Sequence, residues 1–268
     1  MDARIDARQC FHGNSSQVNW MGYHITDVEA FTAFLRGPAH DRVRDLALDA
    51  SFQDQMRDLG GTGMKLGVLE KFLGAVSPIK SWQIGEAIAE CLLAEGSAWQ
   101  ARWPWNMQRD ARTPRASLPG ADLVGFKTAG GEVLLLIGEV KTSSDASNPP
   151  GVMNGRNQGL AYQVENHSVA FSEEHLCLLK WLWARCIGNQ EMEDFYKQAT
   201  ERYLKSEGQD FLLVGAMVRD TPPNELDLSS KGRLMGSRIT APTQLHFLAW
   251  YTPCAIPDWP GLISGGAS

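Results

Sequence analysis

The sequence predicts an α/β (α+β) fold: a mixed central sheet flanked by helices, preceded by a helical N-terminal extension. Two apolar runs, residues 121–126 and 133–142, are separated by a Gly-Gly turn at 130–131 and predict a hairpin. Two later apolar runs, 210–220 and 244–253, predict buried strands, with helical periodicity between the runs. Strands that alternate with helices indicate a sheet with helices packed on its faces.

The organisation along the chain follows from these patterns. Residues 1–78 are expected to be helical, since Thr26 and Glu29 have capping-box spacing and 41–59 show helical charge periodicity. The glycine-rich run GGTGMKLG fits neither phosphate-loop pattern and predicts a turn. Residues 79–255 would form the main domain, with helices at 79–95, 156–183 and 190–206, and 256–268 a flexible tail. The N-terminal region would either dock a partner or cap the sheet.

Composition limits the class of protein. The chain has 268 residues, 43% of them apolar, and 9 tryptophans, enough for a large core. A net charge of −6 argues against a protein that coats nucleic acid, although not against an enzyme with a local basic groove. No apolar run approaches the roughly 18 residues of a membrane span, and the start lacks a signal-peptide pattern, so a cytoplasmic protein without a membrane partner is expected.

Other chemistries find little support. The five cysteines are scattered without a CxxC pair, which indicates reduced thiols rather than disulfides or a zinc site. The six histidines show no HxxxH or HxH spacing and no GxSxG occurs, so the histidines are expected to be ordinary surface or core residues.

The apolar run LLLIGEVKTSS carries two charged residues, Glu139 and Lys141. Their side chains would point to one face of the strand, where burial of unpaired charges is costly. Asp122 stands near the start of the partner strand, and hairpin pairing would place it beside Glu139. Two carboxylates and one ammonium at a sheet edge predict a site for a hard divalent cation such as Mg²⁺.

Flanking residues complete an ordered set: an acid in the helix IGEAIAE (Glu86, with Glu90 as second choice), then Asp122 in PGAD, Glu139 and Lys141 in GEVK, and Gln158 and Tyr162 in NQGLAY. This set resembles the PD-(D/E)xK nuclease superfamily, in its RecB-like branch with a QxxxY helix. Pro119 does not directly precede the acid, a departure of little weight because proline is not a ligand. An ExK triplet alone has a high false-positive rate, and the specificity comes from the order of the whole set.

The resemblance implies a restriction-endonuclease-like fold and a metal-dependent phosphodiesterase that leaves a 5′-phosphate. Asp122, Glu139 and the Val140 carbonyl would ligate Mg²⁺ (or Mn²⁺), Glu86 would hold a water or a second metal, and Lys141 would position or deprotonate the attacking water. Gln158 would orient the nucleophile or substrate and Tyr162 would contact the DNA backbone. The ordinary alternatives are a solvated helix face for Glu86, a polar and aromatic pair for Gln158 and Tyr162, and a strand-ending lysine that reaches water for Lys141.

The segment 99–115 combines tryptophans with arginines (Trp99, Trp103 and Trp105; Arg102, Arg109, Arg112 and Arg115). Arginines bind phosphates and tryptophans can stack on unpaired bases. We interpret the tryptophans as anchors of the loop in the core, and we expect Arg109, Arg112 and Arg115 to contact nucleic acid.

A helical N-terminal third, a compact core and the run LLIGEVKTS are similar to the nuclease subunit of the Hachiman antiphage defence system. That resemblance implies a helicase/ATPase partner that holds the nuclease inactive until it meets damaged or foreign DNA. One alternative is a stand-alone restriction- or repair-type endonuclease, which a homodimer would favour because two sites cut two strands. The other is a catalytically retired nuclease-fold scaffold, against which the intact Asp122, Glu139 and Lys141 argue.

Overall fold

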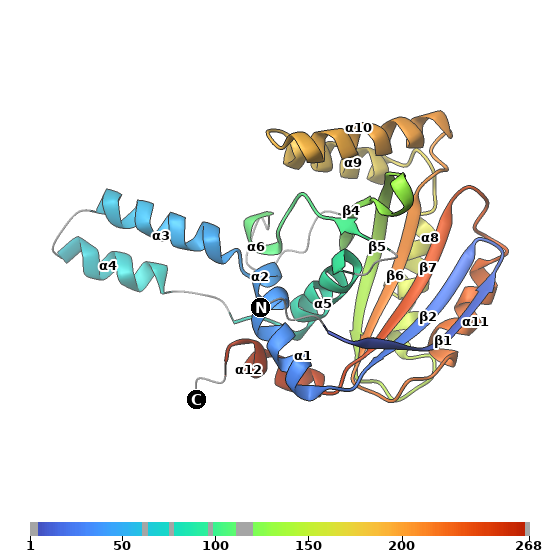
Figure 1. The fold of residues 1–268 in the computed structure, drawn as a ribbon, viewed down its shortest axis with the longest axis horizontal. Helices are drawn as coiled ribbons and strands as arrows, with labels where there is room; N and C mark the ends of the chain where they lie inside the picture. The colour runs from blue at the N-terminus through green and yellow to red at the C-terminus, as the bar shows by residue number, and fades with distance from the viewer. Residues whose placement is uncertain (1–4, 61–63, 75–77, 96–98, 111–119, 266–268) are drawn as a thin grey trace.

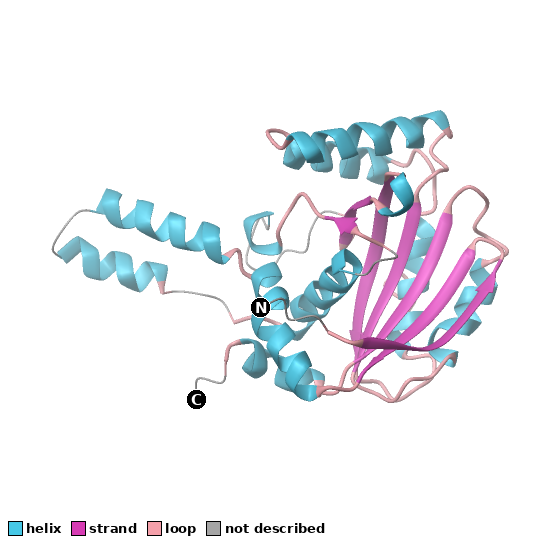
Figure 2. Ribbon diagram, in the orientation of Figure 1, coloured by secondary structure: helices cyan, strands magenta, loops and turns pink. Residues whose placement is uncertain are grey.

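A seven-stranded mixed sheet forms the centre of the protein (Figure 2). The structure, a computed structural model, describes residues 5–60, 64–74, 78–95, 99–110 and 120–265. Strands β2, β7, β6 and β5 are parallel, and β1, β4 and β3 each pair antiparallel with their neighbour, in the order β1-β2-β7-β6-β5-β4-β3. The strands are β1 (Ala7–Ser15), β2 (Val18–Ile25), β3 (Ala101–Arg102), β4 (Leu123–Lys127), β5 (Leu134–Ser143), β6 (Leu212–Arg219) and β7 (Gln244–Tyr251). The predicted mixed α/β architecture is confirmed.

Helices cover both faces of the sheet, which explains why its central strands are continuous apolar runs (Figure 1). One face packs against α1 (Val28–Phe34), η1 (Leu35–Ala39), α2 (His40–Val43), α5 (Ser81–Glu95) and α12 (Trp259–Ile263). The other face packs against α8 (Leu160–Asn166), α9 (Glu173–Cys186), α10 (Gln190–Lys205) and α11 (Leu226–Met235). The remaining short helices are α6 (Met107–Asp110), η2 (Ala129–Gly131), α7 (Gly151–Asn154) and η3 (Ile256–Asp258).

The predicted hairpin, both later strands and the helices near 79–95 and 190–206 are present within a few residues of their expected bounds. The range predicted as helical, 156–183, contains two helices, α8 and α9. They are separate because Ser172 begins a new helix by accepting a hydrogen bond from the His175 backbone N–H. This break places His167, which directly follows α8, against the sheet.

The sequence predicted a helical N-terminal region, but its first part is a β-hairpin. Residues Ala7–Ile25 form the β1–β2 hairpin, and β2 pairs in parallel with β7, so a domain boundary at residue 78 would divide one sheet. Helix begins only at Val28, and its N-cap is Asp27 rather than Thr26, since the Asp27 side chain accepts from the Ala30 N–H at 2.9 Å.

Two further N-terminal helices, α3 (Leu46–Gly60) and α4 (Met64–Leu73), lie side by side and extend away from the sheet (Figure 1). Leu69 is buried between them, whereas Phe52, Leu59, Val68 and Phe72 expose large apolar surfaces. Among the side chains that the structure describes, none from this helix pair belongs to the two cores around the sheet.

The predicted flexible tail is ordered as far as Ile263. Residues after Ala255 form η3 and α12, and Trp259 and Ile263 are buried in the core that contains α1. Arg36 holds the end of α12 by donating from Nε to the Leu262 carbonyl at 3.0 Å. Burial of these two apolar side chains outweighs the disorder that a glycine-rich terminus would otherwise favour.

Candidate active site

The candidate site lies where β4 begins and β5 continues past it. Leu123 is the first residue of β4 and pairs with Gly138, so β5 has no strand beside it from Glu139 onward on this edge. Asp122, one residue before β4, fills the gap: its Oδ2 accepts a hydrogen bond from the Val140 N–H at 3.0 Å. The predicted juxtaposition of Asp122 and Glu139 is therefore present.

The Val140 carbonyl faces the same open edge. In a strand, the N–H and C=O of one residue point to the same side, and the Val140 N–H points toward Asp122. The backbone oxygen expected as a cation ligand is thus directed past the end of β4.

Glu139 is buried, with 2% of its surface exposed, and both of its oxygens have partners. Oε2 lies 3.2 Å from the Lys141 Nζ, and Oε1 lies 3.0 Å from the His167 Nε2. On the opposite edge of the imidazole, Nδ1 lies 3.4 Å from Glu174 Oε1. Glu139 thus sits between a lysine on its own strand and a histidine that follows α8.

Glu86 reaches the site from the other face of the sheet, on α5. A side chain at Gly85 would place its Cβ 1.9 Å from the Thr142 Oγ1, so glycine is what allows α5 to approach β5 this closely. The half-buried Glu86 carboxyl consequently lies within the electrostatic field of Asp122 and Glu139.

Two of the three carboxyl groups have strongly raised pKa values. Burial, followed by the charge of Glu139, raises the pKa of Asp122 to about 7, against the opposing effects of the Val140 N–H and Lys141. Burial, followed by the charges of Asp122, Glu90 and Glu139, holds the pKa of Glu86 well above its usual range. Near neutral pH this cluster therefore retains protons that a divalent cation would displace.

The pKa values of Glu139 and His167 both shift toward the charged form, Glu139 downward and His167 upward. Burial would raise the pKa of Glu139, but the hydrogen bond from His167 and the charge of Lys141 outweigh it and lower the value. Burial would lower the pKa of His167, but its hydrogen bond to Glu139 and the charge of Glu174 outweigh that effect and raise the value. Glu139 is therefore the carboxylate of the cluster that is held ionised.

The donor set fits Mg²⁺ or Mn²⁺ in its chemistry. Two carboxylates, Asp122 and Glu139, and the Val140 carbonyl are oxygen ligands, and Mg²⁺ keeps several waters in its remaining positions. Across the described ranges, no three His, Cys, Asp or Glu side chains converge closely enough to hold an ion by themselves. Asp122 acts on Glu86 through its charge, and the place of Glu86 as a ligand stays a prediction.

Glu90, the second choice for the helix acid, has a different role. It is fully buried and ion-paired with Arg42, whose Nη1 also donates to the Trp105 carbonyl at 2.6 Å. The Glu90 carbonyl accepts from the Trp103 Nε1 at 3.1 Å. Glu90 therefore joins α2, α5 and the segment before β4, and it acts on the acidic cluster (Asp122, Glu139 and Glu86) only through its charge on Glu86.

The tryptophans of segment 99–110 are core anchors, as interpreted from the sequence. Trp99 is buried with its ring edge-on to His246 at 4.7 Å, and Trp105 is buried with its Nε1 donating to the Val124 carbonyl at 2.6 Å. Trp103 is half-buried against Gly125.

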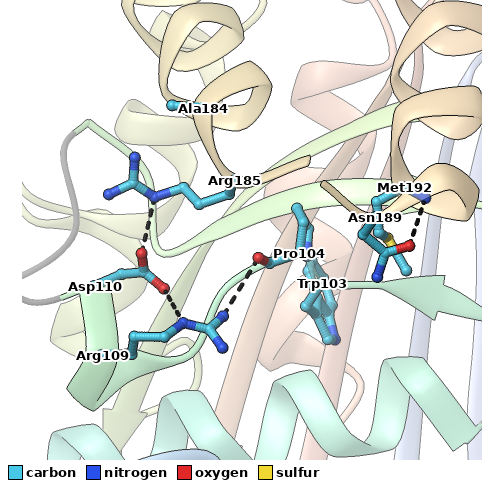
Figure 3. Close-up of a pocket in the computed structure, with 8 residues that line it drawn as sticks. All are labelled: Trp103, Pro104, Arg109, Asp110, Ala184, Arg185, Asn189 and Met192. Carbon is cyan, nitrogen blue, oxygen red and sulfur yellow. Dashed lines mark hydrogen bonds and ion pairs between the residues drawn. The ribbon is translucent and has the colours of Figure 1, made fainter. Parts of the chain in front are cut away.

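Arg109 lines a cavity of about 480 Å³ beside α9 and α10 (Figure 3). Its guanidinium is 3.3 Å from Asp110 and 3.6 Å from Asp45, and Arg185 binds the other Asp110 oxygen at 2.9 Å. These carboxylates offset the charge that would attract phosphate, and the acidic cluster does not line this cavity. DNA contact by Arg109 remains a prediction, and Arg112 and Arg115 lie outside the described residues.

Gln158 and Tyr162 were expected on one helix, but only Tyr162 lies on α8. Gln158 is exposed in the turn before α8, and Tyr162 lies on α8 with 43% of its surface exposed. Within the described chain, neither side chain forms a hydrogen bond or an ion pair. The residue after α8, His167, contacts Glu139 instead. From the sequence, His167 was expected to be an ordinary core or surface residue.

Neither a scan against protein-family models nor a search of curated proteins found a match. In the described part of the chain, no helix has the length and apolar character needed to cross a bilayer. The chemistry of the acidic cluster therefore carries the functional interpretation.

Proposed function

We propose that this protein is a metal-dependent nuclease that hydrolyses the phosphodiester bonds of DNA. The observation that carries the proposal is the acidic cluster itself: three carboxyl groups, Asp122, Glu139 and Glu86, meet Lys141 at the open end of the β4–β5 hairpin, with raised pKa values for two of them. A strongly perturbed group of this kind marks a functional site more often than a structural one.

The residues of the site would have separate roles in the reaction. Asp122, Glu139 and the Val140 carbonyl would hold Mg²⁺ or Mn²⁺, which supplies Lewis-acid stabilisation and activates a water. Lys141, aligned by its 3.2 Å contact with Glu139, orients that water and offsets the negative charge that develops on the scissile phosphate. Its side chain is 22% exposed, so the ammonium can meet a substrate at the surface.

Glu86 holds a water at the edge of the site. Burial, followed by the charges of its acidic neighbours, holds the pKa of Glu86 well above the usual range, which favours a protonated carboxyl that can donate a hydrogen bond. A protonated carboxyl beside two acids avoids a third buried negative charge.

By its resemblance to the nuclease of the Hachiman system, we place the protein in an antiphage defence complex with a helicase/ATPase partner. The exposed apolar side chains of α3 and α4 (Phe52, Leu59, Val68 and Phe72) support a protein contact there, because no described side chain of these two helices belongs to either core.

The test is cleavage by the purified protein with Mg²⁺ or with EDTA, on supercoiled plasmid, linear duplex and single-stranded DNA, with an RNA of the same sequence. Wild type is compared with Glu139→Gln and Lys141→Met. The exposed pair Glu201 and Lys205, joined by a 2.6 Å ion pair, supplies matched controls as Glu201→Gln and Lys205→Met.

Metal-dependent cleavage that both site variants lose and both controls keep supports the proposal. If wild type is inactive alone, the helicase partner with ATP and DNA ends is added. Inactivity of that complex, or cleavage unchanged in Glu139→Gln, refutes the proposed function.

A further inference from the structure

His167 is the one partner of Glu139 that is both buried and anchored at a distance from the site. Its side chain is 3% exposed, against 22% for Lys141, and its Nε2 lies 3.0 Å from Glu139 Oε1. A glutamate side chain has three rotatable bonds, so a fixed donor is what keeps its carboxylate in one orientation.

The His167 ring lies between two carboxylates. Nε2 is within hydrogen-bond distance of Glu139 at 3.0 Å, whereas Nδ1 makes only an ion-pair contact with Glu174 at 3.4 Å and has no hydrogen-bond partner in the described chain. Rotation of the ring would take the Nε2 away from Glu139, so the buried position of the ring keeps this contact in place.

The backbone of His167 is tied to α9 and α10. Its carbonyl accepts from His175 Nε2 at 2.9 Å, and the Tyr203 hydroxyl donates to His175 Nδ1 at 2.7 Å. The same hydroxyl accepts from the Phe171 N–H at 3.0 Å. This chain of hydrogen bonds runs from α10 through α9 to Glu139, and every side chain in it is buried.

We propose that His167 is a positioning residue for the metal site: it holds the Glu139 carboxylate in the orientation that binds the cation beside Asp122. The inference rests on the proposed nuclease function. Each carboxylate oxygen has two lone-pair sites, so Oε1 can accept from His167 and still leave a position for the ion. Partners that hold a metal ligand in place typically contribute about 10–100-fold to metal affinity.

The experiment measures the Mn²⁺ dissociation constant of the full-length protein by calorimetry, for wild type, His167→Ala and His167→Gln. We expect His167→Ala to weaken Mn²⁺ binding by about 10–100-fold. In His167→Gln the amide N–H takes a place close to that of Nε2, so most of the affinity should return. Cleavage by His167→Ala should recover at saturating Mn²⁺, because the residue acts through the ion.

Thermal unfolding of each variant without metal separates positioning from folding. If His167→Ala does not fold, Glu174→Gln takes its place, since Glu174 is 34% exposed and supports the same ring from its other edge. That variant should weaken Mn²⁺ binding by a smaller factor, with an unchanged unfolding midpoint.

The outcomes are distinct. Wild-type Mn²⁺ affinity in His167→Ala, or in Glu174→Gln where the alanine variant fails to fold, overturns the role of His167 while the nuclease proposal stands. Equal weakening in His167→Ala and His167→Gln also overturns it. Wild type that neither binds Mn²⁺ nor cleaves DNA with its partner refutes the nuclease proposal itself.

Discussion

Two buried charge clusters lie at β5 and its neighbours, and they are built in opposite ways. In the first, Arg219 and Asp227 are fully buried and ion-paired, and the Tyr251 hydroxyl donates to Asp227 Oδ2 at 2.7 Å. Arg219 also donates to the carbonyls of Asp145 and Ser147. This cluster holds one acid and one base, closed from solvent, and it fixes the chain that follows β5.

The acidic cluster has the reverse balance. Its three carboxyl groups outnumber its two bases, Lys141 and His167, and Asp122 and Glu86 keep partial access to solvent. The closed cluster balances its charges within the protein, so loss of one partner would leave an uncompensated buried charge. Two carboxyl groups of the open cluster have raised pKa values and so retain protons, and the proposed cation would displace these protons and complete the cluster.

The largest effect should come from Lys141→Met, which removes the only ammonium in the open cluster. We expect cleavage to fall by about 10²–10³-fold, as when a donor aimed at a developing negative charge is deleted. The unfolding free energy should change by less than about 1 kcal/mol, since Lys141 is partly solvated. Single-turnover cleavage rates, paired with urea unfolding, check both statements.

Arg219→Met should instead act on stability. Removing one partner of a buried pair leaves Asp227 unpaired and should lower the unfolding free energy by about 3–5 kcal/mol. The double variant Arg219→Met with Asp227→Leu should recover much of the loss, because no buried charge remains. A single variant as stable as wild type in urea unfolding would show that the two clusters do not differ in this way.

Asp122→Asn should stabilise the metal-free protein above neutral pH. Because the folded pKa is raised from 3.8 to about 7, the stability contributed by this group is present below pH 4 and is lost as the pH rises through about 7. Asparagine lacks that charge yet can still accept from Val140, so a gain of up to about 4 kcal/mol is expected at pH 8 and almost none at pH 4.

With Mg²⁺ present at pH 8, wild type should instead be more stable than Asp122→Asn. Mg²⁺ should raise the unfolding midpoint of wild type and leave that of Asp122→Asn nearly unchanged. Thermal scans at pH 4 and pH 8, with and without Mg²⁺, check the prediction, and a variant less stable than wild type at pH 8 without metal would contradict it.

The smallest effect should come from Tyr162→Ala. The exposed Tyr162 on α8 would contact the DNA backbone, and loss of one such hydrogen bond costs about 1 kcal/mol, so the KM for DNA should rise about fivefold. Mn²⁺ affinity should stay at the wild-type value. An unchanged KM would remove Tyr162 from the DNA-binding surface.

The central strands could be predicted because burial on both faces makes them continuous apolar runs, and the register of one hairpin then placed Asp122 beside Glu139. The N-terminal hairpin could not be, since β2 obtains its partner across the whole chain, with Val18 paired to Leu245. The roles of His167 and Glu90 could not be predicted for the same reason. Their partners, Glu139 and Arg42, lie on other elements and leave no local pattern.

The most direct test of the central claim, that the acidic cluster binds a divalent cation, is calorimetry of Mg²⁺ or Mn²⁺ binding at pH 7 in buffers of different ionisation enthalpy. The account predicts saturable binding with release of about one proton per ion, because the cation displaces a proton shared among the raised carboxyls. Asp122→Asn should lose both the binding and the proton release. Absence of binding in wild type, or binding without proton release that Asp122→Asn retains, would contradict it.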